Sequence, residues 1–235
     1  MKALRTLFLS VLVLALVAFG AASLWLGKGV KAAVEKFGPG IIGAPVTIDA
    51  VVLTPWSGKG LVKGLVIGNP PGFKGPYAVK VGSIELALKL SSLTSDVIVV
   101  KRLAVRDPEL AYELGSGGSN VGRLQKNAEA ASGGPSKSSP SSGPSKSLLI
   151  EELSIAGGQV GVAAGPLGGA KVPLPAVELR NLGGKGKTAA QTVAEALGGL
   201  TGAAQKAVSN IGGKALDAAA SQVMGRIGGL FKGKK

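Results

Sequence analysis

The segment from Asn181 to Thr188 is the part of this sequence that most resembles a chemical motif. It reads Asn-Leu-Gly-Gly-Lys-Gly-Lys-Thr and lies between a predicted strand and a predicted helix. A phosphate-binding loop has the pattern G-x-x-x-x-G-K-[ST], and Gly186-Lys187-Thr188 fits its end. Position 181 is Asn, however, and no apolar strand ending in an acid supplies a magnesium partner. In a chain with 38 glycines such partial matches are expected by chance, so we do not predict nucleotide binding.

The acidic residues do not form a pattern that supports catalysis. The chain has 13 Asp and Glu residues but no His and no Cys, so it lacks the commonest general base and every thiolate ligand. Glu151 and Glu152 are adjacent and would point to opposite faces of a strand. Asp107 and Glu109 would share a face, but Pro108 between them indicates the start of a strand. We therefore predict no enzyme activity, no catalytic residue, no metal site and no cofactor.

The net charge of +14 suits an anionic partner, either nucleic acid or the head groups of acidic lipids. Nucleic-acid binding needs aromatic residues interleaved with the charge or a recognition helix, and aromatic residues make up only 4% of the chain. We predict no nucleic-acid partner. A cytosolic nucleic-acid binder would also require that the long apolar run near the N-terminus is not an anchor.

That apolar run extends from Leu7 to Leu26 and contains no charged residue. At 1.5 Å per helical residue it would span about 30 Å, the thickness of a hydrocarbon core. Trp25 stands near its far end, where interfacial aromatic residues collect. We predict that residues 1–6 form a short tail and that residues 7–26 form a single transmembrane anchor.

Two questions about this anchor stay open. The small residues Gly20-Ala21-Ala22 fit a signal-peptide cleavage site, although the apolar run is longer than the usual signal core. The flanking positive charges, Lys2 and Arg5 before the run and three lysines after it, are almost balanced, so they do not determine the orientation.

The rest of the chain predicts an α+β fold. A β-rich domain over residues 27–131 is expected to begin with a short helix over 28–37 that ends at Gly38-Pro39-Gly40. In the first strand, over 46–53, we expect Val46, Ile48, Ala50 and Val52 to share a face. We expect an antiparallel body of about eight strands in all. The expected strands cover residues 46–53, 61–67, 79–90, 97–105, 109–114, 148–155, 159–164 and 177–182.

The clearest strand is that over 79–90, where Ile84, Leu86, Leu88 and Leu90 alternate with mostly polar residues. This apolar face must be covered. Either the C-terminal helical segment packs on it as an ordinary core, or acyl chains lie along it, because an open sheet with one apolar face can bind lipid. The four residues are therefore candidate lipid contacts.

Residues 132–147 contain only Ser, Gly, Pro and Lys and form a predicted linker. After the further strands of residues 148–182, residues 183–235 form a basic tail with apolar residues every three or four positions. Glycine pairs are expected to divide it into two or three amphipathic Ala/Gly-rich helices. Either this tail packs on the sheet or it lies on anionic lipid. In the second case the membrane-surface contacts would include Lys206, Lys214, Arg226 and Lys232.

The order of these parts resembles the AsmA-like family of bacterial envelope proteins, within the wider group that has a repeating β-groove. The resemblance is best over residues 64–114, where a strand leads into Asn69-Pro-Pro-Gly-Phe73. A long alternating strand then ends at Leu90-Ser-Ser-Leu93, and a β-branched strand leads to Asp107-Pro108 and on to Tyr112-Glu113. Upstream, Gly43 to Ile48 is also similar, whereas the second half is compatible but less distinctive.

The resemblance implies a cytoplasmic N-terminus, a periplasmic body and a single-pass location in the bacterial inner membrane. It further implies a role in outer-membrane or cell-envelope maintenance through lipid handling, with phospholipid as ligand and without catalytic residues. The chain is much shorter than the long family members, so one copy could not form a lipid conduit between two membranes. An anchored scaffolding module without lipid transfer, paired with a second copy or another envelope protein, is the alternative.

Overall fold

The computed structural model describes residues 25–133, 147–162 and 171–232, and for residues 211–232 it describes the backbone only. Residues 7–24 of the predicted anchor and residues 134–146 of the predicted linker lie outside these ranges. Within the described part of the chain, no helix is both long and apolar enough to cross a membrane. The described fold is α+β, with a large mixed sheet and three helices.

The sheet has nine strands among the described residues, and its main order is β1-β3-β4-β5-β8-β11. β2 also pairs with β3, and β9 joins β5 to β10. A separate two-stranded ribbon, β6 with β7, follows β5. The strands are β1 (Val46–Thr47), β2 (Ala50–Thr54), β3 (Lys59–Ile67), β4 (Val79–Leu88), β5 (Val97–Tyr112), β6 (Leu114–Gly115), β7 (Gly118–Ser119), β8 (Ser147–Ala156), β9 (Gln159–Val162), β10 (Lys171–Pro173) and β11 (Val177–Gly183).

The expectation of a purely antiparallel body is wrong, because β5 pairs in parallel with both β8 and β9. Val97 at the start of β5 lies opposite Ser147 at the start of β8. Parallel neighbours need a long crossover connection, which here includes helix α2 (Asn120–Gly133) and residues 134–146. The segments on either side of the Ser/Pro/Gly-rich stretch therefore build one sheet.

One row of residues, which runs across neighbouring strands of the sheet, interrupts the alternation of side chains along each strand. After this row, side chains point to the opposite side from that expected by simple alternation. Gly64, Asp107 and Gly157 on this row have φ values of 62°, 49° and 74°, in the left-handed region. The pairing registers place Asp49 opposite Gly64, Gly82 between Gly64 and Asp107, and Gly157 beside Asp107. We call these five residues the crease row. The alternation shifts by one residue in all these strands at the same row. The pairing register between neighbouring strands is therefore the same before and after the row.

The crease row explains why simple alternation fails in the first strand. Val46 and Ile48 are buried before the row and Val51 is buried after it, a spacing of three instead of two. Val52, which was expected to share their face, is 45% exposed. The same change occurs in β4, where Val79 and Val81 point to the core before the row and Ile84 packs against the core after it.

β5 also differs from expectation at this row, since it is one strand of 16 residues and does not stop at Asp107-Pro108. Pro108 is buried opposite Val81, and Asp107 takes the left-handed conformation that lets the strand continue in the shifted phase.

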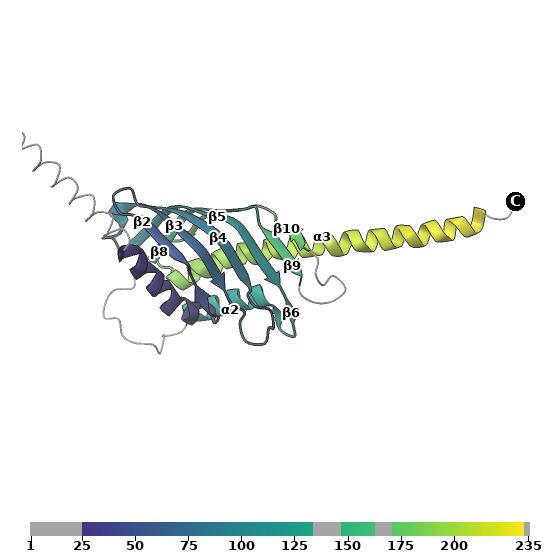
Figure 1. Cartoon of the computed structure of the whole chain (residues 1–235), viewed down its shortest axis with the longest axis horizontal. Coiled ribbons are helices and arrows are strands. Elements are labelled where there is room, and N and C mark those ends of the chain that lie inside the picture. Colours follow the sequence, from purple (N-terminus) through teal and green to yellow (C-terminus); the bar gives the residue numbers. More distant parts are fainter. Residues whose placement is uncertain (1–24, 134–146, 163–170, 233–235) are drawn as a thin grey trace, which may run out of the picture.

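A helix over residues 25–42 lies along the edge formed by β1 and β2 (Figure 1). It does not stop at Gly38 as predicted. A Cβ atom at Gly38 would lie only 3.2 Å from the side chain of Val46, and one at Gly27 would overlap the Val51 carbonyl. The two glycines therefore allow the helix to pack closely on the sheet edge, against the Val46 side chain and the Val51 backbone.

The C-terminal tail forms a single helix, α3 (Ala189–Lys232), so the prediction of two or three helices is wrong. α3 packs on β8, β9, β10 and β11 and against α2, and then continues beyond the sheet (Figure 1). At Gly199 a Cβ atom would lie 2.5 Å from the side chain of Leu179. Here too glycine allows close approach to the sheet rather than ending the helix. α2 contributes the fully buried Val121, Leu124 and Ala128 to the same core.

Candidate functional site

The phosphate-loop-like segment uses its polar groups within the protein. Lys187 forms an ion pair with Glu195 of α3, and the Gly183 amide donates a hydrogen bond of 2.8 Å to the same carboxylate. Burial raises the pKa of Glu195, but the hydrogen bonds from Lys187 and Gly183 outweigh it and lower the pKa overall. Thr188 and Gln191 exchange hydrogen bonds as a capping box at the start of α3. These contacts occupy the lysine and the amide that a phosphate would need.

A hollow of about 200 Å³ with a mostly apolar lining lies around Glu109. The Tyr77 hydroxyl donates a hydrogen bond of 3.2 Å to Glu109, whose other oxygen lies 4.0 Å from Lys171 Nζ. Burial, followed by the nearby Glu109 charge, raises the pKa of Tyr77. The charges of Glu109 and Lys171 compensate each other, and none of the described residues that line the hollow is an activated nucleophile. In the described part of the chain, no three acidic residues lie close enough together to hold a metal ion.

The loop that carries Asn69-Pro-Pro-Gly-Phe73 is fixed by buried polar contacts. Asn120, the fully buried first residue of α2, donates hydrogen bonds to Asn69 Oδ1 at 2.8 Å and to the Ala111 carbonyl at 2.6 Å. Asn69 in turn donates to the Gly75 carbonyl at 2.8 Å. The loop therefore has a structural role, and Asn120, which the sequence did not single out, is its main support.

The best candidate site is the half-buried apolar part of the inner sheet face. We define the open apolar face as the apolar residues of β3, β4 and β5 whose side chains lie on the same side of the sheet as α3 and are partly exposed. They are Val62, Ile84, Leu86, Leu88, Leu103 and Val105.

Cross-strand rows show where this face is covered. Leu86 lies opposite Leu103, which lies beside Leu153 of β8, and Leu153 is only 2% exposed beneath α3. Ile84 lies opposite Val105, which lies beside the buried Ile155 in the same way. The residues of β3, β4 and β5 on these rows are thus half-buried, and they lie between Ile155 on one side and Val51 of β2, which is 7% exposed, on the other. The face carries no charged group, so the chemistry it offers is contact with hydrocarbon.

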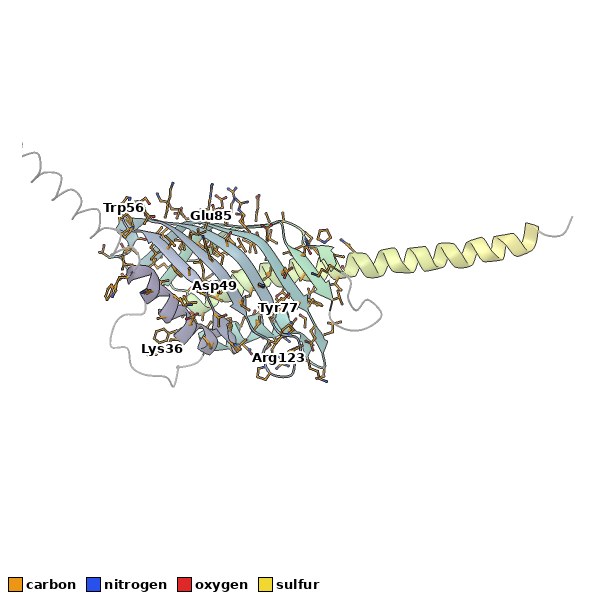
Figure 2. The ribbon with its side chains drawn as sticks, viewed as in Figure 1. Lys36, Asp49, Trp56, Tyr77, Glu85 and Arg123 are labelled. Carbon is orange, nitrogen blue, oxygen red and sulfur yellow. The ribbon has the colours of Figure 1, made fainter. Side chains whose placement is uncertain are left out.

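Glu85, between Ile84 and Leu86, points to the opposite, solvent-facing side of the sheet (Figure 2). Leu90 does not belong to the face, because β4 ends at Leu88 and Leu90 starts a short 3₁₀ helix (Leu90–Ser92). Its side chain lies next to Gly58 and is 38% exposed. Three of the four predicted lipid contacts therefore lie together, and the fourth lies beyond the end of the strand.

The basic residues of the tail are distributed along α3. Lys206 is exposed on the part that packs against the sheet, where Leu200, Ala204 and Ala207 are buried. Lys214, Arg226 and Lys232 lie on the later part of the helix, whose side chains the structure does not describe. Packing on the sheet is thus found for the first part of the tail.

An apolar flank of helix 25–42 was missed by the sequence analysis. Leu26, Val30, Val34 and Phe37 are all exposed, although their spacing places them on one side of the helix. That spacing was readable in the sequence, but the direction of the flank relative to the sheet was not.

Comparison with known proteins adds no relative, since no family model, no curated protein and no solved structure matches this chain.

Proposed function

We propose that this chain is a non-enzymatic, membrane-anchored protein of the bacterial cell envelope whose β domain handles lipid through the open apolar face. The apolar run Leu7–Leu26 supports a single pass through the inner membrane. The resemblance to AsmA-like proteins supports a periplasmic body and a role in envelope and outer-membrane maintenance.

The observation that carries this proposal is the incomplete cover of the inner sheet face. α3 buries Leu153 and Ile155, whereas Ile84, Leu86 and Leu88 of the same face stay partly accessible. A domain that only needed a core would gain about 25 cal/mol for each Å² of apolar surface that it buried there. An acyl chain would gain the same free energy by occupying that surface.

The dimensions favour local lipid contact over transport across the envelope. Six strands form the main path of the sheet. At about 4.8 Å per strand, six strands make about 30 Å, the thickness of one hydrocarbon core. One copy therefore reaches lipid near its own membrane, and a longer path would need other proteins or further copies.

The proposal is tested by photo-crosslinking in intact membranes. A diazirine amino acid at Leu86 is expected to capture phospholipid, and the same amino acid at Glu85 should not, because residue 85 faces the other side of the sheet. Leu16, within the apolar run, serves as the positive control. Capture at Leu16 without capture at Leu86 would show that the chain is anchored but does not bind lipid through this face.

The side of the membrane on which the body lies is tested separately by cysteine labelling. Because the chain has no cysteine of its own, a single introduced cysteine is labelled specifically. A single cysteine at Glu85, which is exposed, is expected to react with a membrane-impermeant maleimide in spheroplasts. Protection of this cysteine in spheroplasts and reaction only after lysis would contradict the periplasmic location.

A scaffolding role is the second candidate, and the continuation of α3 beyond the sheet favours it (Figure 1). A helix that leaves the body can reach a second copy or another envelope protein. Truncation after Asn210 keeps the part of α3 that packs on the sheet. If this truncation removes a co-purifying partner and leaves lipid capture at Leu86 unchanged, scaffolding is a separate function. If the partner is retained, the hypothesis that the end of α3 binds a partner is wrong.

A further inference from the structure

Helix 25–42 docks on the sheet with polar and small residues. Lys31 donates a hydrogen bond to the Ile48 carbonyl, and Glu35 accepts one of 2.8 Å from the Ile48 amide. Lys31 and Glu35 also pair with each other at 3.0 Å. The two side chains thus satisfy both backbone groups of Ile48, the first of the two residues between β1 and β2, at the edge of the sheet.

The apolar flank of the same helix has no such cover. We use "apolar flank" for the four residues at spacings of four, four and three: Leu26, Val30, Val34 and Phe37. Their exposed fractions are 41%, 40%, 37% and 63%. A surface helix of a soluble domain normally turns its apolar stripe to the core and its ion pairs to water. In this helix only Ile41 and Ile42, at its end, join the core, whereas the four residues of the apolar flank stay exposed. The exposure of these four residues indicates that the flank meets another apolar phase.

We infer that helix 25–42 lies on the membrane surface, with the apolar flank in the lipid. This inference rests on the proposed anchor, since Leu26 is both the first residue of the flank and the last residue of the apolar run. The apolar flank therefore begins where the proposed anchor leaves the bilayer. Trp25, next to it, is 78% exposed, which is expected of a tryptophan that contacts the membrane interface.

Charge complementarity supports an anionic bilayer as the occupant. The exposed charges of helix 25–42 are those of Lys28 and Lys36, and both are positive. The only acid of the helix, Glu35, is engaged by Lys31 and by the Ile48 amide. An amphipathic helix with lysines on its polar side binds acidic head groups while its apolar side enters the acyl boundary.

The apolar flank leads to the core of the domain at the end of the helix. Ile41 continues the flank, four residues after Phe37, and packs against the buried core together with Ile84 and Leu88. The apolar side of the helix therefore ends at the core of the domain.

Depth-dependent fluorescence quenching tests the inference on the full chain in vesicles of phosphatidylethanolamine and phosphatidylglycerol. Single cysteines at Val34 and Phe37 carry an environment-sensitive dye, and Ala32, which is exposed on another side of the helix, is the matched control. We expect quenching at 34 and 37 by lipids with a nitroxide near the acyl boundary, about 5–10 Å deep. Quenching by nitroxides at the bilayer midplane should be weaker, and position 32 should be quenched by neither.

A fourth cysteine at Leu16 separates this inference from the proposed anchor. Midplane quenching at Leu16 without quenching at 34 and 37 would overturn the surface helix and leave the anchor in place. No quenching at any position would overturn both. If Phe37→Cys instead forms disulfide-linked dimers in vesicles and its dye is not quenched, the flank binds a second copy and the inference is wrong.

Discussion

The side chain of Asn120 donates a hydrogen bond of 2.8 Å to the side chain of Asn69, across 51 positions of the sequence. This contact joins the first residue of α2 to the loop that follows β3. Asn120 Oδ1 also accepts hydrogen bonds from the Glu113 and Val121 amides, at 3.1 and 2.9 Å. One buried amide group thus fixes the end of β5, the start of α2 and the loop at the same time.

Asn120→Ala is therefore expected to destabilise the domain strongly. It leaves the Glu113 amide and Asn69 Oδ1, which are partly buried, without their partner, and a fully buried unsatisfied group costs about 1–3 kcal/mol. Asn120→Asp keeps the shape but replaces the donating NH₂ with an oxygen that faces two acceptors, so it should also destabilise. Thermal unfolding of the full chain in detergent measures both. Gln125→Ala, which removes a partly exposed hydrogen bond to Glu129, is the control and should change little.

The crease row predicts opposite effects for two glycines of the same row. Gly64→Ala places a Cβ atom 1.8 Å from the Asp49 carboxylate at a φ of 62°, whereas Gly82→Ala meets nothing within 4 Å. We expect Gly64→Ala to lower the free energy of unfolding by about 2–4 kcal/mol, from left-handed strain and overpacking. Gly82→Ala should be neutral or stabilise by about 0.5–1 kcal/mol.

The two causes at Gly64 can be separated by chemical denaturation of the double variant. In an Asp49→Gly background every side-chain atom of residue 49 is removed, including the Cβ that lies 2.8 Å from a Cβ at position 64, so Gly64→Ala should cost only the left-handed strain, about 1–2 kcal/mol. An unchanged cost in that background would mean that Asp49 does not restrict this position. If Gly64→Ala and Gly82→Ala change the free energy of unfolding equally, the left-handed conformation of Gly64 in the crease row is wrong.

The sequence predicts the parts of this fold that follow local rules. Alternation located β4, although this strand ends at Leu88 and not at Leu90. The prediction that Ile84, Leu86 and Leu88 share one face is also confirmed. These features depend on residues that are close in the chain.

The missed features depend on contacts between distant residues. A left-handed Asp107 in the middle of β5 is only understandable beside Gly82 and Gly157, which are neighbours through pairing and not through sequence. The parallel pairing of β5 with β8 likewise follows from the crossover through α2. Gly38 and Gly199 resembled helix breakers because glycine is a poor helix former, but packing against Val46 and Leu179 decides their role.

Glu35 predicts how stability depends on pH at the sheet edge. The hydrogen bond from the Ile48 amide, and then that from Lys31, hold the pKa of Glu35 below its usual 4.5. A carboxylate with a lowered pKa in the folded state contributes stability that is fully present above the unfolded value. That contribution is lost as the pH falls from about 4.5 through the folded value.

Glu35→Gln should therefore flatten the dependence of the melting temperature on pH below 4.5, while the other carboxylates still contribute their own slope. Thermal melts at a series of pH values from neutral to acidic measure this. Glu178, an exposed acid for which no hydrogen bond or ion pair is found within the described residues, provides the control in Glu178→Gln. A slope that is the same in Glu35→Gln and in the unchanged protein would exclude Glu35 as a source of acid sensitivity.

The docking of α3 makes the last prediction, because two glycines one turn apart on this helix have different surroundings. At Gly199 a side chain would meet Leu179 at 2.5 Å, whereas nothing lies within 4 Å of Gly202. Gly199→Leu should force α3 away from β11 and destabilise by about 1–3 kcal/mol. Gly202→Ala should stabilise by about 1 kcal/mol through helix propensity alone. If α3 moves, Leu153 also loses its cover, so a diazirine at position 153 should capture lipid in Gly199→Leu but not in Gly202→Ala. Failure of this capture in a variant that is destabilised as expected would mean that α3 stays docked and that Leu179 yields instead.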